Sequence, residues 1–260
     1  MHIVTLTTDF GTADWFVGTM KGVILSIAPR AKIVDITHEI PGGDIRAGAF
    51  ALAASYRFFP RKAIHIAVVD PGVGSRRTAI AVQTADYFFI GPDNGVLSLA
   101  LAKERIKSIH RLTNKKFFLQ PVRQTFHGRD VFAPVAAHLS EGVALRKFGP
   151  EQKYFTRLDW SGPRQNRGTI QGEVVYIDRF GNAITNITGE LLAQLKPSSL
   201  RVFVQQKRLC PVKDFYQAVP VGKAVGVIGS SGFLEIAVNG GSAAQEFSLK
   251  IGDAVAVRKK

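Results

Sequence analysis

The chain has 260 residues, a formal net charge of +14, 46% hydrophobic residues and a single cysteine, Cys210. This composition supplies a sizeable core, and one cysteine excludes a disulfide framework within the chain and any cysteine-based zinc finger. No apolar run reaches the roughly 18 residues of a membrane span, and Asp9 and Asp14 interrupt the first apolar stretch, which excludes a signal peptide. We therefore expect a cytoplasmic protein with one large domain or two smaller ones.

The first 160 residues alternate short apolar runs with amphipathic stretches. The runs at residues 2–6, 33–36, 63–69, 78–83 and 87–90 are rich in Val, Ile and Phe and predict strands. Residues 14–28 and 44–59 predict helices, each opened by an aspartate suited to an N-cap. Alternating strands and helices favour an N-terminal α/β domain over residues 1–160, with a mainly parallel sheet covered on both faces.

The pattern changes after residue 160. Residues 161–168 are Gly, Pro and polar residues, typical of a linker. The remainder, residues 169–260, contains one helical stretch, 187–195, and several short strand-like runs, at residues 172–178, 201–205, 224–229, 233–239 and 253–258. Many short strands with frequent turns predict a smaller C-terminal all-β domain, barrel-like in form.

The excess positive charge is not concentrated in one segment of the sequence. Lys and Arg are spread over both halves of the chain, and no long basic stripe is interleaved with aromatic residues. A nucleic-acid partner is therefore not expected, although a basic balance alone leaves that class open. No grouping of His, Cys and acidic residues has the spacing of metal ligands, so no metal site is expected.

Acidic residues follow several of the predicted strands. Asp70 comes directly after the strand at 63–69 and begins the turn sequence DPGVG, with Arg77 seven residues later. Asp9 follows the first strand, Asp178 ends the strand at 172–178, and Asp93 with Asn94 follows the strand at 87–90. In open α/β sheets, ligands bind at the carboxyl ends of the strands. Asp70 and Arg77 are thus placed at the lip of one crevice, although a DPG sequence also occurs as simple turn punctuation.

A histidine stands in a second segment of interest, FHGRDVFAP at residues 126–134. His127 precedes a predicted helix that Asp130 is suited to cap. An isolated histidine is more often structural than catalytic. A catalytic role for His127 is therefore supported only in combination with the other segments. Asp93, Asn94 and Asp130 are expected to be structural.

The motifs resemble one family in their order and spacing: TTDFG at 7–11, DPGVG at 70–74, PDNG at 92–95, FHGRD at 126–130, DRFGN at 178–182 and SSGFLEIAVNGGSA at 230–243. It is the family of S-adenosylmethionine hydroxide adenosyltransferases, also called S-adenosylmethionine hydrolases, which are relatives of the fluorinating and chlorinating enzymes. The resemblance spans nearly the whole chain. It implies the same two-domain division, and a homotrimer whose sites lie between the N-terminal domain of one subunit and the C-terminal domain of its neighbour.

The resemblance also implies a reaction. Water or hydroxide attacks C5′ of the ribose of S-adenosyl-L-methionine, which releases L-methionine and forms adenosine without a cofactor. Asp70, Arg77 and His127 match the water-activating triad, with His127 as a candidate acceptor of the proton of the water. Asp9 matches the ribose-binding acid and Asp178 the acid that holds the ammonium group. The remaining substrate contacts implied are Asn182 and the backbone around Asn239 for adenine, Ser230 for the methionine end, and Phe215 or Tyr216 for stacking on adenine.

Besides the nucleic-acid class left open by the charge, two other functions that use the same pocket remain open at this point. The halogenating relatives carry an aromatic residue where this chain has Asp70 and lack a histidine at the position of His127, so the polar triad favours hydrolysis. A non-catalytic protein that binds S-adenosylmethionine or a nucleoside would use the same pocket, but it would have no need of a water-activating group. Phe215 and Tyr216 are equally consistent with residues of the barrel core.

Overall fold

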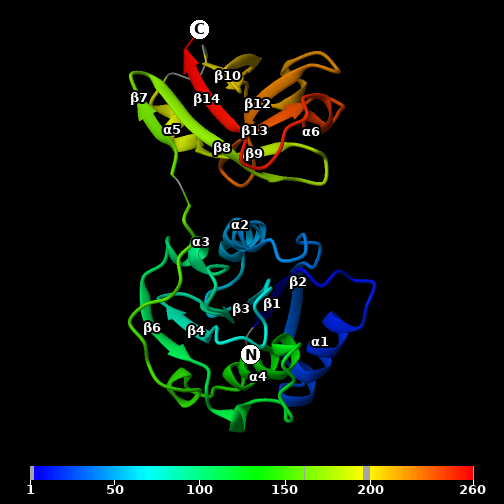
Figure 1. Ribbon diagram of the computed structural model, residues 1–260, viewed down its shortest axis with the longest axis vertical. Coiled ribbons are helices and arrows are strands. Elements are labelled where there is room, and N and C mark those ends of the chain that lie inside the picture. The colour runs from blue at the N-terminus through cyan, green and yellow to red at the C-terminus, as the bar shows by residue number, and fades with distance from the viewer. Residues whose placement is uncertain (1–2, 161, 196–199, 260) are drawn as a thin grey trace. The chain divides into compact units, whose positions relative to one another are not determined.

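Two separate apolar cores organise the chain. In the computed structural model, which describes residues 3–160, 162–195 and 200–259, one core belongs to a unit of residues 1–159 and the other to a unit of residues 160–260 (Figure 1). Ser161, the first residue of the predicted linker, lies outside the described residues. Arg164–Asn166, within that predicted linker, form a short strand.

The first unit is built on a six-stranded sheet in the order β2-β1-β3-β5-β4-β6. Its strands are β1 Ile3–Thr8, β2 Lys32–Thr37, β3 Ile64–Val68, β4 Ala79–Thr84, β5 Phe88–Pro92 and β6 Ile106–Arg111. β2, β1, β3 and β5 are parallel to one another, whereas β4 runs antiparallel to both of its neighbours. The sheet is therefore mixed. The predicted parallel order holds for four strands, and two of them, β1 and β3, lead into Asp9 and Asp70.

Helices cover both faces of this sheet. They are α1 Phe16–Ile27, α2 Ile45–Ser55, α3 Ser98–Leu101 and α4 Ala133–Ser140, the last preceded by a π-helical turn at Gly128–Phe132. In Figure 1, α1 and α4 lie together on one side of the sheet, and α2 and α3 on the other. α1 buries Val17, Met20 and Ile24, which share one helical face, against the strand residues of the core. Single 3₁₀ turns occur at Tyr56–Phe58, Lys115–Phe117 and Leu145–Lys147.

Of the three predicted N-caps, one is confirmed and two were wrong. Asp44 caps α2 as expected, because its Oδ1 accepts a hydrogen bond of 2.9 Å from the amide of Ala47. The prediction for Asp14 was wrong: α1 begins at Phe16 with Trp15 at the N-cap and no side-chain cap. The cap predicted for Asp130 was also wrong, since this residue lies inside the π-helical turn.

The second unit is an antiparallel sheet that nearly closes into a barrel. The strands follow the order β11-β10-β14-β8-β9-β13-β12, with β7 paired to β8. Their bounds are β7 Arg164–Asn166, β8 Thr169–Ile177, β9 Ala183–Thr188, β10 Leu200–Val204, β11 Lys207–Pro211, β12 Ala224–Ile228, β13 Phe233–Val238 and β14 Ala254–Lys259. A bridge between Val212 and Gly226 joins the two ends of the strand order. Short helices α5 Gly189–Ala193 and α6 Ala243–Glu246 and a 3₁₀ turn at Tyr216–Ala218 complete the unit.

The helix predicted at 187–195 is shorter in the structure. Ile187 and Thr188 end β9, and Thr188 caps α5 by accepting a hydrogen bond from the amide of Leu191. The first apolar residue of this segment belongs to β9 and most of the later ones to α5. Because the apolar residues also fit one helical pattern, the sequence did not show the boundary between strand and helix. β11 was not predicted because its sequence, KRLCP, is largely polar at an end of the strand order.

A strand of the first unit's sheet carries a buried histidine that is neutral. His65 on β3 is fully buried among the rings of Tyr56, Phe59, Tyr87 and Phe89, and its Nδ1 lies 2.8 Å from the hydroxyl of Thr5. Burial lowers the pKa of His65 to about 3.

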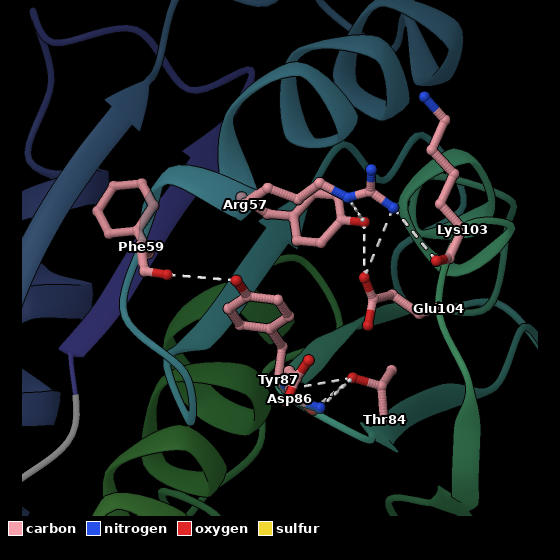
Figure 2. A network of polar contacts seen from close by, with 8 residues as sticks. Arg57, Phe59, Thr84, Asp86, Tyr87, Lys103 and Glu104 are labelled. Carbon is pink, nitrogen blue, oxygen red and sulfur yellow. Dashed lines mark hydrogen bonds and ion pairs between the residues drawn. The ribbon is translucent and has the colours of Figure 1, made fainter.

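Polar contacts surround the edge of this aromatic cluster. Figure 2 shows the Arg57 guanidinium between the carbonyl of Lys103 and the carboxylate of Glu104, and Tyr87 bonded to the carbonyl of Phe59. The hydroxyl of Tyr56 donates to Glu104 over 2.9 Å. These bonds tie the turn after α2 to the segment after α3, on the side of the sheet away from α1 and α4.

The neutral state of His65 predicts acid sensitivity. Between pH 6.5 and about 3, the unfolded chain binds a proton at this residue that the folded chain does not. The free energy of unfolding should therefore fall with falling pH in this window, by up to about 1.4 kcal/mol per pH unit from this residue. Urea titrations between pH 6.5 and about 3 give the free energy of unfolding at each pH. In His65→Asn this free energy should depend less steeply on pH than in the parent. Thr5→Val should lower the free energy of unfolding without changing its dependence on pH. The same pH dependence in His65→Asn and the parent would contradict the account.

Candidate active site

Asp9 and Asp70 lie at the same edge of the sheet. β1 and β3 are parallel neighbours, with Thr8 opposite Val68, so the residues that follow them emerge side by side. Both aspartates line a cavity of about 530 Å³ in the first unit, together with His127 and apolar residues that include Phe16 and Phe126. The strand-end rule thus brings two of the predicted site residues into one cavity.

Arg77 connects Asp70 to His127 behind the cavity wall. Its Nε donates to Asp70 Oδ1 over 2.9 Å, and its Nη2 pairs with Asp70 Oδ2. The same Nη2 lies 2.8 Å from His127 Nδ1. The side chains of Arg77 and Asp70 are 11% and 4% exposed. The three residues that the sequence singled out as a triad therefore form one hydrogen-bonded chain.

The Arg77 contact decides the tautomer of His127. A guanidinium has only donors, so His127 Nδ1 is the acceptor and the neutral ring carries its proton on Nε2. Burial lowers the pKa of His127, and the charge of Arg77 lowers it further, while Asp70 and Asp130 act in the opposite direction. The ring is therefore a neutral donor at neutral pH, with Nε2–H as its remaining polar group.

Two contacts hold the turn that carries Asp70 and Arg77. Asn94 Nδ2 donates to the carbonyl of Val69 over 2.8 Å, immediately before Asp70. Asp93 Oδ2 accepts from the hydroxyl of Thr78 over 3.1 Å, immediately after Arg77. The PDNG motif thus anchors both ends of the turn, which agrees with the structural role expected for Asp93 and Asn94.

Gly74 makes the turn fit against the segment before His127. It has a φ of +78°, and a Cβ at this position would collide with the backbone carbonyl of Gln124. Asp130 holds the same segment from the other side: it is fully buried, and its Oδ2 accepts from the amide of Arg123 over 2.8 Å. Asp130 is therefore structural, although not as a cap.

Asp9 is anchored by one of its two carboxylate oxygens. Oδ2 accepts a hydrogen bond of 2.8 Å from the amide of Gly43. The preceding residue, Thr8, is buried, and its hydroxyl lies 2.8 Å from Nδ1 of the buried His38. These contacts fix the direction in which Asp9 enters the cavity.

The site residues predicted in the second unit form local clusters. Asp178 Oδ1 accepts from the amides of Phe180 and Asn182, each over 2.9 Å, and Asn182 Nδ2 donates to Asp178 Oδ2 over 3.0 Å. Asn239 Nδ2 donates to the carbonyl of Val219 over 2.8 Å. Tyr216 and Phe215 are 42% and 59% exposed, so they are not barrel core.

Two further residues of this unit were not singled out from the sequence. Phe180, in the turn held by Asp178, is 77% exposed and offers an apolar face beside Asn182. Glu235 is a buried carboxylate that accepts a hydrogen bond from Tyr216. The sequence does contain a sign of Glu235, because it is the one acidic residue in the otherwise apolar strand FLEIAV.

Comparison with known proteins identifies the family. The model of the SAM hydroxide adenosyltransferase N-terminal domain matches residues 4–149, and that of the C-terminal domain matches residues 172–256. The chain belongs to the SAM hydroxide adenosyltransferase family. The resemblance seen in the motifs is thereby confirmed.

Individual relatives cover nearly the whole chain. An (R)-S-adenosyl-L-methionine hydrolase of Salinispora tropica is 40% identical over 98% of this chain and 97% of its own. A fluorinase of Actinoplanes is 26% identical over 99% of this chain and 97% of its own. The crystal structure of an uncharacterized conserved protein from Thermotoga maritima superposes with a TM-score of 0.94 at 37% identity, covering 99% of this chain and 100% of that one.

Within residues 3–160, 162–195 and 200–259, no group of three or more His, Cys, Asp or Glu side chains is arranged to hold a metal ion. No helix in this part of the chain is long and apolar enough to cross a membrane.

The Arg77 bridge predicts the titration of His127. Replacing Arg77 by Met removes the neighbouring charge that lowers the pKa of His127, so this pKa should rise. Asp70→Asn removes the charge that raises it, so the pKa should fall. Nuclear magnetic resonance of the histidine rings measures both shifts. His138, whose pKa is lowered by burial alone, is the internal control and should not move; an unmoved His127 in both variants would rule out the bridge in solution.

Proposed function

We propose that this protein hydrolyses S-adenosyl-L-methionine to adenosine and L-methionine by attack of water at C5′ of the ribose. The observation that carries the proposal is the Asp70–Arg77–His127 chain at the wall of the cavity that Asp9 also lines. The relative from Salinispora tropica is named an (R)-S-adenosyl-L-methionine hydrolase, which supports hydrolysis of this substrate. The sulfonium is already a good leaving group, so neither a general acid nor a cofactor is required.

The triad orients a water molecule at the wall of the cavity. Asp70 accepts a hydrogen bond from the water, and the Nε2–H of His127 donates to its oxygen. This role differs from that of a proton acceptor, because the Arg77 contact occupies Nδ1 and leaves the proton on Nε2. A carboxylate cannot deprotonate free water in advance. The proton therefore moves as the O–C5′ bond forms and the C5′–S bond breaks, with Asp70 as its first acceptor and solvent as the last.

Residues of both units bind the substrate in this proposal. Asp9 accepts hydrogen bonds from the ribose hydroxyls and Asp178 from the ammonium group of the methionine part. The other contacts to the substrate come from Asn182 and Asn239 for adenine, Ser230 for the methionine end, and Phe215, Tyr216 or the exposed Phe180 for the apolar face of the base.

Transfer of the adenosyl group to a halide is the second candidate, favoured only by the fluorinase relatives. A halide beside Asp70 would face a carboxylate and would give up its hydration for few donors. Water instead gains both an acceptor and a donor. A protein that only binds the substrate would have no use for this arrangement.

Turnover tests the function directly. Pure protein incubated with S-adenosyl-L-methionine, without halide or methyl acceptor, should form adenosine and methionine in equal amounts, as followed by chromatography. His127→Ala should reduce kcat by about 100-fold or more, because one oriented hydrogen-bond donor is lost, while the fold is kept. His127→Gln should retain more activity than His127→Ala, because the amide nitrogen of Gln can replace the Nε2–H donor. Equal activity of His127→Ala and the parent would remove His127 from the mechanism.

We also propose a homotrimer in which each site combines the first unit of one subunit with the second unit of another. Asp9→Ala and Asp178→Ala proteins should each be inactive, and mixing them under conditions of subunit exchange should restore activity, since some sites then carry both acids. Exchange can be followed with differently tagged subunits. Proven exchange without recovered activity would assign both acids to a pocket within one chain.

A further inference from the structure

Glu235 is a buried acid on the outer face of the barrel. Its neighbours along β13, Leu234 and Ile236, belong to the apolar core of the second unit, so strand alternation points Glu235 to the opposite face. There it is 6% exposed, on the side where Val225, Val227 and Ala237 form a small apolar cluster with Val219. A carboxylate in such a place needs a partner that compensates for its burial.

Two segments of the predicted substrate site meet at this carboxylate. The hydroxyl of Tyr216 donates to Glu235 Oε2 over 2.8 Å, while the ring of Tyr216 remains 42% exposed. The turn at 229–232, which carries Ser230, packs on the other side: a Cβ at Gly229 would collide with Glu235 Oε1. One side chain therefore touches the loop that bears Phe215 and Tyr216 and the turn that bears Ser230.

The charge of Asp178 also acts on Glu235. Burial raises the pKa of Glu235, and the charge of Asp178 raises it further against the hydrogen bond from Tyr216. The pKa of Tyr216 rises to about 12, chiefly through burial and then through its bond to Glu235. The phenol thus stays protonated and remains a donor throughout the neutral range.

We infer that Glu235 is a positioning residue of the substrate site: it holds the Tyr216 ring and the turn of Ser230 in the arrangement that receives the adenosyl group. The inference rests on the proposed function and adds a residue to it. Glu235 acts through Tyr216 and does not touch the reacting atoms, so its loss weakens substrate binding and leaves the chemical step intact. If Glu235 only stabilised the barrel, its replacement would change the stability of the protein without changing its affinity for the substrate.

The test compares Tyr216→Phe, Glu235→Ala and Glu235→Gln with the parent protein. The first two remove the hydrogen bond from either side, and each should raise KM and the Kd of adenosine, measured by calorimetry, by about tenfold, typical of a bond to a charged group. kcat should stay within about twofold, the scatter expected when the transition-state contacts are kept. Glu235→Gln keeps an acceptor for Tyr216 and should stay close to the parent. Tyr154→Phe, on an exposed surface, is the control for loss of a phenol.

The outcomes separate this inference from the function on which it rests. An inactive parent protein would overturn hydrolysis, whereas the adenosine Kd values report on Tyr216 and Glu235 without any turnover. An unchanged KM and Kd in Tyr216→Phe would overturn the positioning role, even if Glu235→Ala fails to fold. Glu235→Gln as impaired as Glu235→Ala would also contradict it. The double variant Tyr216→Phe, Glu235→Ala should be no worse than the worse single variant, because both remove the same bond.

Discussion

The arrangement of Asp70 and His127 depends on the hydrogen bonds of the Arg77 guanidinium. It donates to both oxygens of Asp70 and to Nδ1 of His127, so it sets the orientation of the carboxylate and the tautomer of the ring together. A lysine would present a single point charge and could not form this fork. The consequence is a neutral histidine with a donor at Nε2, beside a carboxylate that is almost fully buried.

The fold supplies the rigidity that this bridge needs. Asn94 and Asp93 anchor the residues before Asp70 and after Arg77, and Gly74 lets the intervening turn approach the chain at Gln124. On the side of His127, buried Asp130 fixes the amide of Arg123. Preorganised groups of this kind cost little rearrangement when charge develops, which is why residues that never touch the substrate matter to the reaction. The proposed role of Glu235 follows the same logic in the second unit.

The sequence predicted the strand-end acids well, because period and turn chemistry place them without knowledge of tertiary contacts. Asp9 and Asp70 share one cavity as expected, since β1 and β3 are parallel neighbours. The tautomer of His127 was not predictable, because it depends on a contact across 50 residues of chain. Glu235 was missed for a similar reason: its partner Tyr216 comes from a loop, and only the fold shows that the acid is buried. Asp14 and Asp130 do not cap helices, because α1 begins two residues after Asp14 and Asp130 lies inside the π-helical turn.

The central claim is that the triad delivers water to C5′. Reaction in ¹⁸O-water, with chloride or fluoride present, tests it most directly by mass spectrometry of the nucleoside product. The account predicts the label in the 5′-hydroxyl of adenosine and no appreciable 5′-halo-5′-deoxyadenosine. Halogenated product in quantity would contradict the polar water site, and unlabelled adenosine would mean that the bond is not broken by water at C5′.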